Sequence, residues 1–233
     1  LKLHHLVDDI ERGQSIIWPY PRRTCTISTG FIGCKHINLA LSEGGRTDIA
    51  YRLLTNEDYP SWLFPVKNGA TTIWERWDGW APQQGFQDPQ MNSFNHYAFG
   101  AIGEWMYSVM AGLDFDETVP GGRRLRLCPR PGGGFTHAGA SLDTPYGRAA
   151  CRWQLADGQL TIDITVPPNA TALVRVPADP GYPVTEGGKP LAAAEGLDHI
   201  RTDGQAVWCE AAAGTYRFVS KMPLAAEGDS ALR

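Results

Sequence analysis

The hydrophobic pattern of this 233-residue sequence changes near residue 118, and that change restricts its fold more than any other feature. Before residue 118, apolar residues recur at helical spacing. After it, Pro, Gly and β-branched residues dominate, and apolar residues alternate with polar ones on both sides of the hairpin signal Asp157-Gly158. We therefore predict a helical part over residues 1–117 and an antiparallel β-sandwich over residues 118–233, with a frayed tail from about residue 225.

The spacing of apolar residues in the first part predicts helices over residues 1–12, 32–43, 48–55 and 95–113. The last of these is apolar almost all round, so we expect it to be buried between other elements. Gly100 and Gly103 lower its helix propensity and indicate close packing against another helix. These helices form only a thin core, because a helix that is apolar on all sides needs neighbours that this part of the chain does not supply.

The stretch from Gly69 to Trp80 places three tryptophans within seven residues and sets Glu75, Arg76 and Asp78 among them. An unpaired ion costs several kcal/mol to bury, so a core would exclude the charges, whereas a solvated surface would exclude the rings. Aromatic rings stack on the apolar face of a sugar, and carboxylates bind its hydroxyls or exchange protons. We interpret the stretch as part of a sugar-binding cleft, within a long loop over residues 65–93.

Each of these side chains also has a structural interpretation. On spacing alone, an ion pair of Glu75 with Arg76 or another base is favoured over catalysis. His96 lies at the start of a predicted helix capped by Ser93 or Asn95, where satisfying the local backbone is favoured over binding a substrate. For each of the four tryptophans, a role in packing and a role in contacting the substrate agree equally well with the sequence. These are Trp62, Trp74, Trp77 and Trp80.

Composition excludes several functions. The net charge of −4 and the absence of long basic runs argue against nucleic acid as a partner, and no apolar run is long enough to span a membrane. The five cysteines are scattered and form no C-x-x-C pair, so we expect free thiols, which weakly favour a cytoplasmic location, and neither a metal nor a cofactor. The sequence starts without Met or a signal peptide, as expected for an internal cut of a longer protein.

Five segments occur in an order and at a spacing that resemble the C-terminal part of bacterial α-L-rhamnosidases of glycoside hydrolase family 78. They are Thr29–Gly33, Ala50–Leu54, Tyr59–Leu63, Gly69–Gly79 and Asn92–Ala98. The resemblance covers about residues 1–220 and departs from the family at residues 14–26, where an extra Pro- and Arg-containing piece occurs. It implies the last helices of an (α/α)6 barrel of the six-hairpin type, followed by a C-terminal β-sandwich.

The resemblance also implies inverting cleavage of terminal α-L-rhamnose, which uses two carboxyl groups about 6.5–9.5 Å apart. In similar enzymes the general base is the Glu of the Trp-Glu-Arg-Trp motif, here Glu75, and the His of Asn-His-Tyr, here His96, contacts the sugar. We expect Trp62, Trp74, Trp77 and Asp78 to complete the substrate site. The general acid comes from an earlier segment that we do not find in this chain. We therefore expect little or no activity from these 233 residues alone, and possible partners are the missing N-terminal part or a second copy of the chain.

Two other functions stay compatible with the sequence. A non-catalytic carbohydrate-binding protein would keep Glu75, His96 and the tryptophans without an acid. A six-hairpin glycosidase for a different sugar would keep the fold and change the specificity.

Overall fold

The structure, a computed structural model, describes residue 7 and residues 25–27 and 29–222 of the chain. Contacts divide the chain into two compact units, Leu1–Trp105 and Met106–Arg233. This division comes before the predicted boundary near residue 118, because strand β3 (Leu113–Phe115) already pairs with a strand of the second unit. The helix predicted over residues 1–12, the segment 14–26 and the tail lie largely outside the described residues.

Two of the predicted helices form where the sequence places them, α2 (Phe31–Glu43) and α3 (Thr47–Thr55). The buried residues of α2 recur at helical spacing: Cys34, Ile37, Asn38, Leu41 and Ser42. Gly44 and Gly45 end the helix as predicted, with Gly45 at φ 81°, a conformation that glycine adopts readily. Among the described residues, no helix is both long and apolar enough to cross a membrane.

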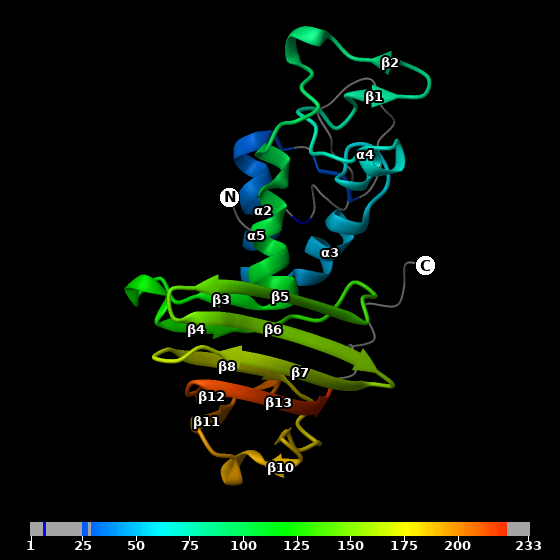
Figure 1. The fold of residues 1–233 in the computed structure, drawn as a ribbon. Coiled ribbons are helices and arrows are strands. Elements are labelled where there is room, and N and C mark those ends of the chain that lie inside the picture. Colours follow the sequence, from blue (N-terminus) through cyan, green and yellow to red (C-terminus); the bar gives the residue numbers. More distant parts are fainter. Residues whose placement is uncertain (1–6, 8–24, 28, 223–233) are drawn as a thin grey trace. The chain divides into compact units, whose positions relative to one another are not determined.

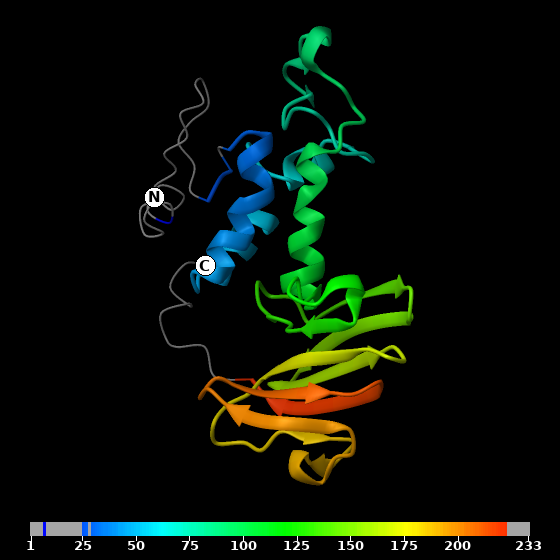
Figure 2. The ribbon, with the colours of Figure 1, turned by 90° about the vertical axis from the view of Figure 1, so that its left-hand side faces the viewer.

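Buried polar contacts join the helices, which lie side by side in Figures 1 and 2. Asn38 Nδ2 donates to the Ala50 carbonyl at 3.0 Å, linking α2 to α3. Trp105 Nε1 donates to Ser42 Oγ at 2.8 Å, and the Trp105 ring meets Tyr51 edge-on with 5.0 Å between ring centroids. The helices of the first unit are therefore fixed by specific hydrogen bonds as well as by apolar burial.

The helix predicted over residues 95–113 is shorter and mixed in type. It consists of a 3-10 turn (Ala98–Ala101), α5 (Ile102–Trp105) and a π-helix (Met106–Ala111). The predicted start at Asn95 is wrong, because residues 95–97 are irregular and the first helical residue is Ala98. The Asn95 amide donates to Ser93 Oγ, and the His96 amide donates to the carbonyl of Ile73.

The burial predicted for this helix is only partly observed, because Tyr107 is 50% exposed. A Cβ at Gly100 would lie 3.3 Å from Ile73 Cγ1, so the close approach there is to the loop that carries Ile73 and not to a second helix. At Gly103 the predicted close packing is also wrong, since no described atom outside the local helix lies within 4 Å of an added Cβ. Gly112, with φ 82°, follows the last helical residue.

Residues between α3 and the 3-10 turn are mainly irregular, as predicted. They contain only short elements: α4 (Leu63–Lys67), β1 (Trp80–Ala81), β2 (Gly85–Phe86) and a 3-10 turn (Pro89–Met91). Strands β1 and β2 pair antiparallel as a small hairpin that projects from the helices of this unit (Figure 1). The segment therefore presents the motif residues on loops rather than on a helix.

The second unit contains two sheets, which confirms the predicted β-sandwich. The six-stranded sheet has the order β10 (Lys189–Pro190), β9 (Thr185–Glu186), β13 (Gly214–Lys221), β7 (Gln159–Val166), β6 (Gly147–Ala156) and β5 (His137–Thr144). The five-stranded sheet has the order β11 (Leu197–Thr202), β12 (Ala206–Ala211), β8 (Thr171–Pro177), β4 (Arg124–Leu127) and β3. Its β4–β8 pair is parallel, whereas the other strand pairs are antiparallel. Short 3-10 turns follow β3 and β10, at Pro120–Gly122 and Leu191–Ala193.

The core of the sandwich explains the alternating pattern in the sequence. Buried positions alternate with half-buried or exposed ones along β6 and β7, and the turn between them uses Asp157 at φ 51° and Gly158 at φ 76°. Trp153 is fully buried and donates its Nε1–H to the Met110 carbonyl at 2.7 Å. The large apolar cluster found in the described residues lies wholly between residues 113 and 218, with additional partly buried residues up to 222.

Candidate functional site

Two segments of the first unit meet at the motif residues, Ile73–Glu75 and Ser93–His96. The Glu75 amide donates to the Ser93 carbonyl at 2.8 Å, and the His96 amide donates to the Ile73 carbonyl at 2.9 Å. The Ser93 amide in turn donates to Glu75 Oε2 at 2.8 Å. These bonds place the two sequence-predicted polar residues, Glu75 and His96, on adjoining segments although 21 positions separate them in the chain.

The Glu75 carboxylate is partly exposed and is positioned by a backbone amide. Oε2 accepts the Ser93 N–H, whereas Oε1 has no hydrogen-bond partner among the described residues. A backbone donor fixes the orientation of a carboxylate without neutralising its charge. One oxygen is therefore held in place and the other is free to bind water or a hydroxyl.

The ion pair that spacing suggested for Glu75 is formed by Asp78 instead. Arg76 Nε lies 3.1 Å from Asp78 Oδ1, and Arg76 Nη2 lies 3.5 Å from Asp78 Oδ2. The side chain of Asp78 is only 7% exposed, while that of Arg76 is 39% exposed. Asp78 therefore carries a buried charge whose structural partner is Arg76, and a contact of Asp78 with substrate stays a prediction.

His96 interacts with both its own backbone and an aromatic ring from α2. Its Nδ1 accepts the Ala98 amide at 3.4 Å, which is the local backbone role considered from the sequence. The imidazole stacks on Phe31 with 4.8 Å between centroids and 22° between planes. When Nδ1 is the acceptor of a neutral imidazole, Nε2 carries the proton and can donate to a hydroxyl. Sequence reasoning missed Phe31, although it lies in the motif Thr29–Gly33.

Trp62 and Trp77 pack within the first unit. Trp62 Nε1 donates to the Phe99 carbonyl at 2.9 Å, and the Trp77 ring stacks on Phe99 with 3.6 Å between centroids. The two tryptophans meet at nearly right angles, 5.7 Å apart, and each is 8% exposed. They therefore stabilise the loop that carries Glu75, and direct stacking on a sugar stays a prediction.

Trp74 is also buried, at 7% exposure, and meets Phe94 edge-on with 5.0 Å between centroids. Nearby, Asn92 Nδ2 donates to the Gly79 carbonyl at 2.8 Å. A Cβ at Gly79 would lie 2.7 Å from Asn92 Oδ1, so a larger residue there would displace the Asn92 side chain. Aromatic and amide contacts thus hold the two motif segments together on either side of the Glu75–Ser93 bond.

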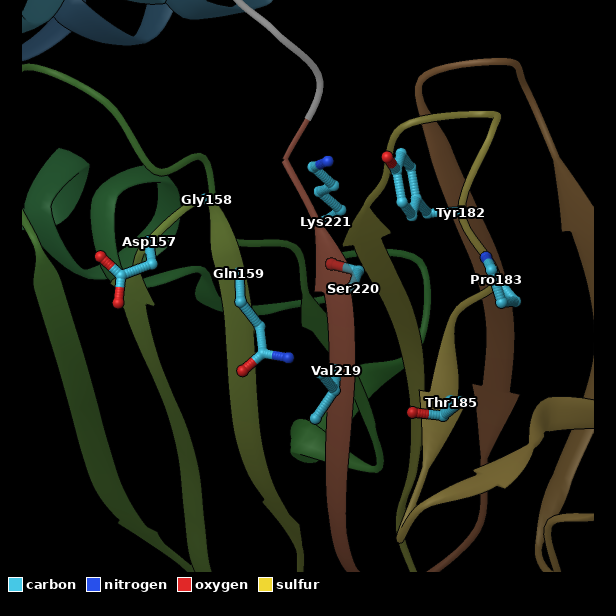
Figure 3. A pocket seen from close by; sticks show the side chains of 9 residues that line it. All are labelled: Asp157, Gly158, Gln159, Tyr182, Pro183, Thr185, Val219, Ser220 and Lys221. Atoms are coloured by element: carbon cyan, nitrogen blue, oxygen red, sulfur yellow. The ribbon is translucent and has the colours of Figure 1, made fainter.

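A separate concave surface lies in the second unit, where β7, β9 and β13 meet (Figure 3). It encloses about 360 Å³, and Lys221 Nζ lies 3.9 Å from the centroid of the Tyr182 ring. Gln159 is opposite Lys221 across the β7–β13 ladder. None of the sequence-predicted site residues lines it, and Asp157 is the one carboxylate among its lining residues. The candidate active site is therefore the motif region of the first unit.

No group of three or more His, Cys, Asp or Glu side chains among the described residues could hold a metal ion. The five cysteines are free thiols, four of them buried.

Comparisons with known proteins agree with this arrangement. Residues 14–110 match the bacterial alpha-L-rhamnosidase 6 hairpin glycosidase domain, and residues 112–190 match the bacterial alpha-L-rhamnosidase C-terminal domain. The chain belongs to the bacterial α-L-rhamnosidase family. The rhamnosidase fold predicted from the motifs, a partial helical barrel followed by a β-sandwich, is confirmed.

Individual α-L-rhamnosidases are similar over most of the chain. The enzyme of Streptomyces avermitilis is 43% identical over 192 residues, and one from Formosa agariphila is 38% identical over 198 residues. These matches cover 82% and 85% of this chain but only 18% and 21% of the relatives, so the chain spans about a fifth of their length.

Solved α-L-rhamnosidase structures match in the same way. The crystal structure of the Streptomyces avermitilis enzyme complexed with L-rhamnose has a TM-score of 0.74, at 43% identity over 84% of this chain and 18% of that one. The enzyme of Dictyoglumus thermophilum has a TM-score of 0.79, at 29% identity over 94% of this chain and 23% of that one.

Proposed function

We propose that this chain supplies the general base and part of the sugar site of an inverting α-L-rhamnosidase that acts on terminal α-L-rhamnose of rhamnosides. The observation that carries the proposal is the pair of hydrogen-bonded segments that brings Glu75 and His96 together. Family membership and the α-L-rhamnosidase relatives support the same reaction class.

In this mechanism, Glu75 removes a proton from the water that attacks the anomeric carbon. The Ser93 N–H holds Oε2, and Oε1 accepts the proton. In an inverting enzyme, the water attacks from the face opposite the leaving oxygen, so the base does not contact the leaving group. A carboxylate oriented by a backbone amide and partly open to solvent is suited to this step.

His96 binds the rhamnose in the same mechanism. With Nδ1 accepting the Ala98 amide, Nε2–H donates to a sugar hydroxyl. Phe31 limits rotation of the imidazole by stacking against its face. Trp62, Trp77 and the Arg76–Asp78 pair hold the loop that presents Glu75, and Asp78 and the tryptophan rings Trp62, Trp74 and Trp77 are the further proposed contacts for the sugar.

We propose that the 233 residues alone do not hydrolyse rhamnosides at a significant rate, because they contain no assigned general acid. A missing acid typically costs about 10²–10⁴-fold in rate. The test is release of p-nitrophenol from p-nitrophenyl α-L-rhamnopyranoside by the isolated chain. A hybrid protein in which this chain replaces the matched segment of the Streptomyces avermitilis enzyme should turn over the same substrate. Rapid turnover by the isolated chain would contradict the proposal.

The two other functions give different results in the same experiments. A pure carbohydrate-binding protein would bind L-rhamnose in calorimetry, and the hybrid would be inactive. Because Trp77 packs on Phe99, a His96→Ala variant tests such binding with less damage to the fold than Trp77→Ala. A glycosidase for another sugar would be found by assaying the hybrid against a panel of aryl glycosides.

A further inference from the structure

A hollow of about 400 Å³ lies on strands β5 and β6 of the second unit and shares no lining residue with the concave surface at β13. Ala138 and Ala140 of β5 pack against the core of the sandwich, so the residues that alternate with them face outwards. On that outer face, Gly139 and its diagonal neighbour Ala150 leave a depression, because neither has a long side chain. Polar side chains surround the depression: His137, Ser141, Arg148 and Arg152.

Gly139 determines where the stem of Arg152 lies. The two residues are directly opposite each other in the β5–β6 ladder. A Cβ at position 139 would lie 3.0 Å from Arg152 Cγ and 3.1 Å from Arg152 Cβ, so the arginine stem lies against the bare backbone of β5. A larger residue at this position would push the stem away. The glycine therefore allows Arg152 to line the hollow.

The guanidinium group of Arg152 has no carboxylate partner among the described residues. Asp163 of β7 is opposite Arg152 in the β6–β7 ladder and could have been that partner. However, Arg217 Nε donates to Asp163 Oδ1 at 2.6 Å, and Arg217 Nη2 donates to Asp163 Oδ2 at 3.1 Å. Because both oxygens of Asp163 are already bonded to Arg217, the charge of Arg152 stays available to a ligand.

Arg148 also lacks an ion pair in the described part of the chain. Asp143 is opposite it in the β5–β6 ladder, but Arg148 Nη2 donates instead to Ser141 Oγ, at 2.8 Å. This neutral bond orients the guanidinium group and leaves its charge uncompensated. No lining residue of the hollow is acidic, so two positive charges meet in a chain whose net charge is −4.

Two guanidinium groups without carboxylates are suited to an oxyanion, because each can form paired, charge-assisted hydrogen bonds with carboxylate or phosphate oxygens. His137 and Ser141 add neutral groups that can bind sugar hydroxyls. A nucleic acid would need a longer track of cations, and no Trp, Tyr or Phe lines the hollow for a base to stack on. We propose that this hollow binds the carboxylate or phosphate group of an acidic sugar. The site is additional to the proposed rhamnosidase reaction, because none of the residues proposed for that reaction lines it.

Titrations of the 233-residue chain followed by ¹⁵N–¹H NMR test the proposal with D-glucuronate, D-glucose 6-phosphate and neutral D-glucose. We expect one or both acidic sugars to cause saturable shifts in the amide signals of β5 and β6, and D-glucose to cause none. The comparison of the two acidic sugars shows which oxyanion the site prefers. Added sodium chloride should weaken the binding, because salt screens exposed charges. None of these ligands contains rhamnose, so the result does not depend on the proposed role of Glu75.

Three variants should reduce the affinity for the acidic sugar. Arg148→Gln and Arg152→Gln should each weaken binding by roughly tenfold, the size of one lost charge-assisted hydrogen bond. Gly139→Ala should also weaken it, although both arginines remain, because the added Cβ displaces the stem of Arg152. Arg126→Gln is the matched control, since it removes an exposed arginine from β4 in the other sheet and should leave the affinity unchanged.

Arg217→Gln provides a further readout, because Arg217 does not line the hollow. This variant frees the carboxylate of Asp163 for Arg152, and we expect it to weaken binding of the acidic sugar. The proposal is overturned if neither acidic sugar binds, or if D-glucose binds as tightly as they do. Wild-type affinity in both Arg148→Gln and Arg152→Gln would overturn it too, as would an equal loss in Arg126→Gln, since the effect would then reflect total charge.

Discussion

Glu75 and Ser93 form a reciprocal pair: the Glu75 amide donates to the Ser93 carbonyl, and the Ser93 amide donates to Glu75 Oε2, both at 2.8 Å. The backbone of one motif therefore orients the carboxylate of the other. A general base needs this kind of support, because the reaction rate depends on holding the carboxylate where it can take a proton from the attacking water.

Replacing Glu75 with Gln separates orientation from basicity. The amide oxygen still accepts the Ser93 N–H, but the side chain no longer takes a proton from water. In the hybrid enzyme we expect kcat to fall by roughly 10²–10⁴-fold with little change in thermal stability or in KM. Glu117→Gln, at an exposed position of the second unit, is the control. Wild-type kcat in Glu75→Gln would exclude Glu75 as the base.

Removing Arg76 should destabilise the motif loop. Arg76→Gln leaves the carboxylate of Asp78 buried without its cation, and we expect the free energy of unfolding to drop by roughly 1–3 kcal/mol. The double variant Arg76→Gln/Asp78→Asn should recover part of the loss, because the buried charge is then absent. Urea titrations measure both differences. Equal stability of Arg76→Gln and wild type would show that the pair has no structural role.

Gly103, within α5, and Gly112, just after the π-helix, should respond in opposite directions to replacement by alanine. Gly103→Ala is expected to raise the free energy of unfolding by roughly 0.5–1 kcal/mol, because it removes a flexible residue from a helix where an added Cβ meets no described neighbour. Gly112→Ala should be strongly destabilising, because φ is 82° and its Cβ would lie 2.2 Å from Pro129 N. Thermal melts of both variants give the comparison, and a stabilising Gly112→Ala would contradict the described geometry.

Because several cysteine thiols are buried, we expect the folded state to lose stability at alkaline pH. Burial raises the pKa of Cys34 and of Cys209 to about 12, from an ordinary value of 9.0. The folded state keeps these protons while the unfolded state loses them, so their contribution is complete below pH 9 and declines as pH rises towards about 12. Melting temperatures from pH 8 to 11 should show a shallower decline for Cys209→Ala than for wild type. If the melting temperatures of Cys209→Ala and wild type declined equally with pH, the buried Cys209 thiol would not be a source of the alkaline loss of stability.

The sequence predicts the sandwich better than the helical part, for a physical reason. Alternation over β6 and β7 and the Asp157-Gly158 turn are local signals that need no distant partner. The helix over residues 95–113 depends instead on contacts with Ile73 and Ser93, which periodicity does not report, and its predicted start was therefore wrong.

In the candidate site, too, contacts between distant segments could not be predicted from the sequence. Residue type and motif predict Glu75 and His96 as site residues, and this stays a prediction. Spacing alone favoured an ion pair of Glu75 with Arg76 or another base, whereas the structure pairs Arg76 with Asp78. Ser93 and Phe31 act through a backbone amide and a ring face, and neither kind of contact leaves a pattern in a single sequence. Only the folded chain shows which residues orient the carboxylate and the imidazole.

The most direct test of Glu75 as the general base is azide rescue of a Glu75→Ala variant of the hybrid enzyme. Azide attacks without losing a proton, so it does not need the base. We predict that Glu75→Ala is nearly inactive in buffer and that added azide restores cleavage of p-nitrophenyl α-L-rhamnopyranoside, giving the β-L-rhamnosyl azide of inverted configuration. Wild-type hydrolysis by Glu75→Ala without azide, or an azide product of retained configuration, would contradict the assignment.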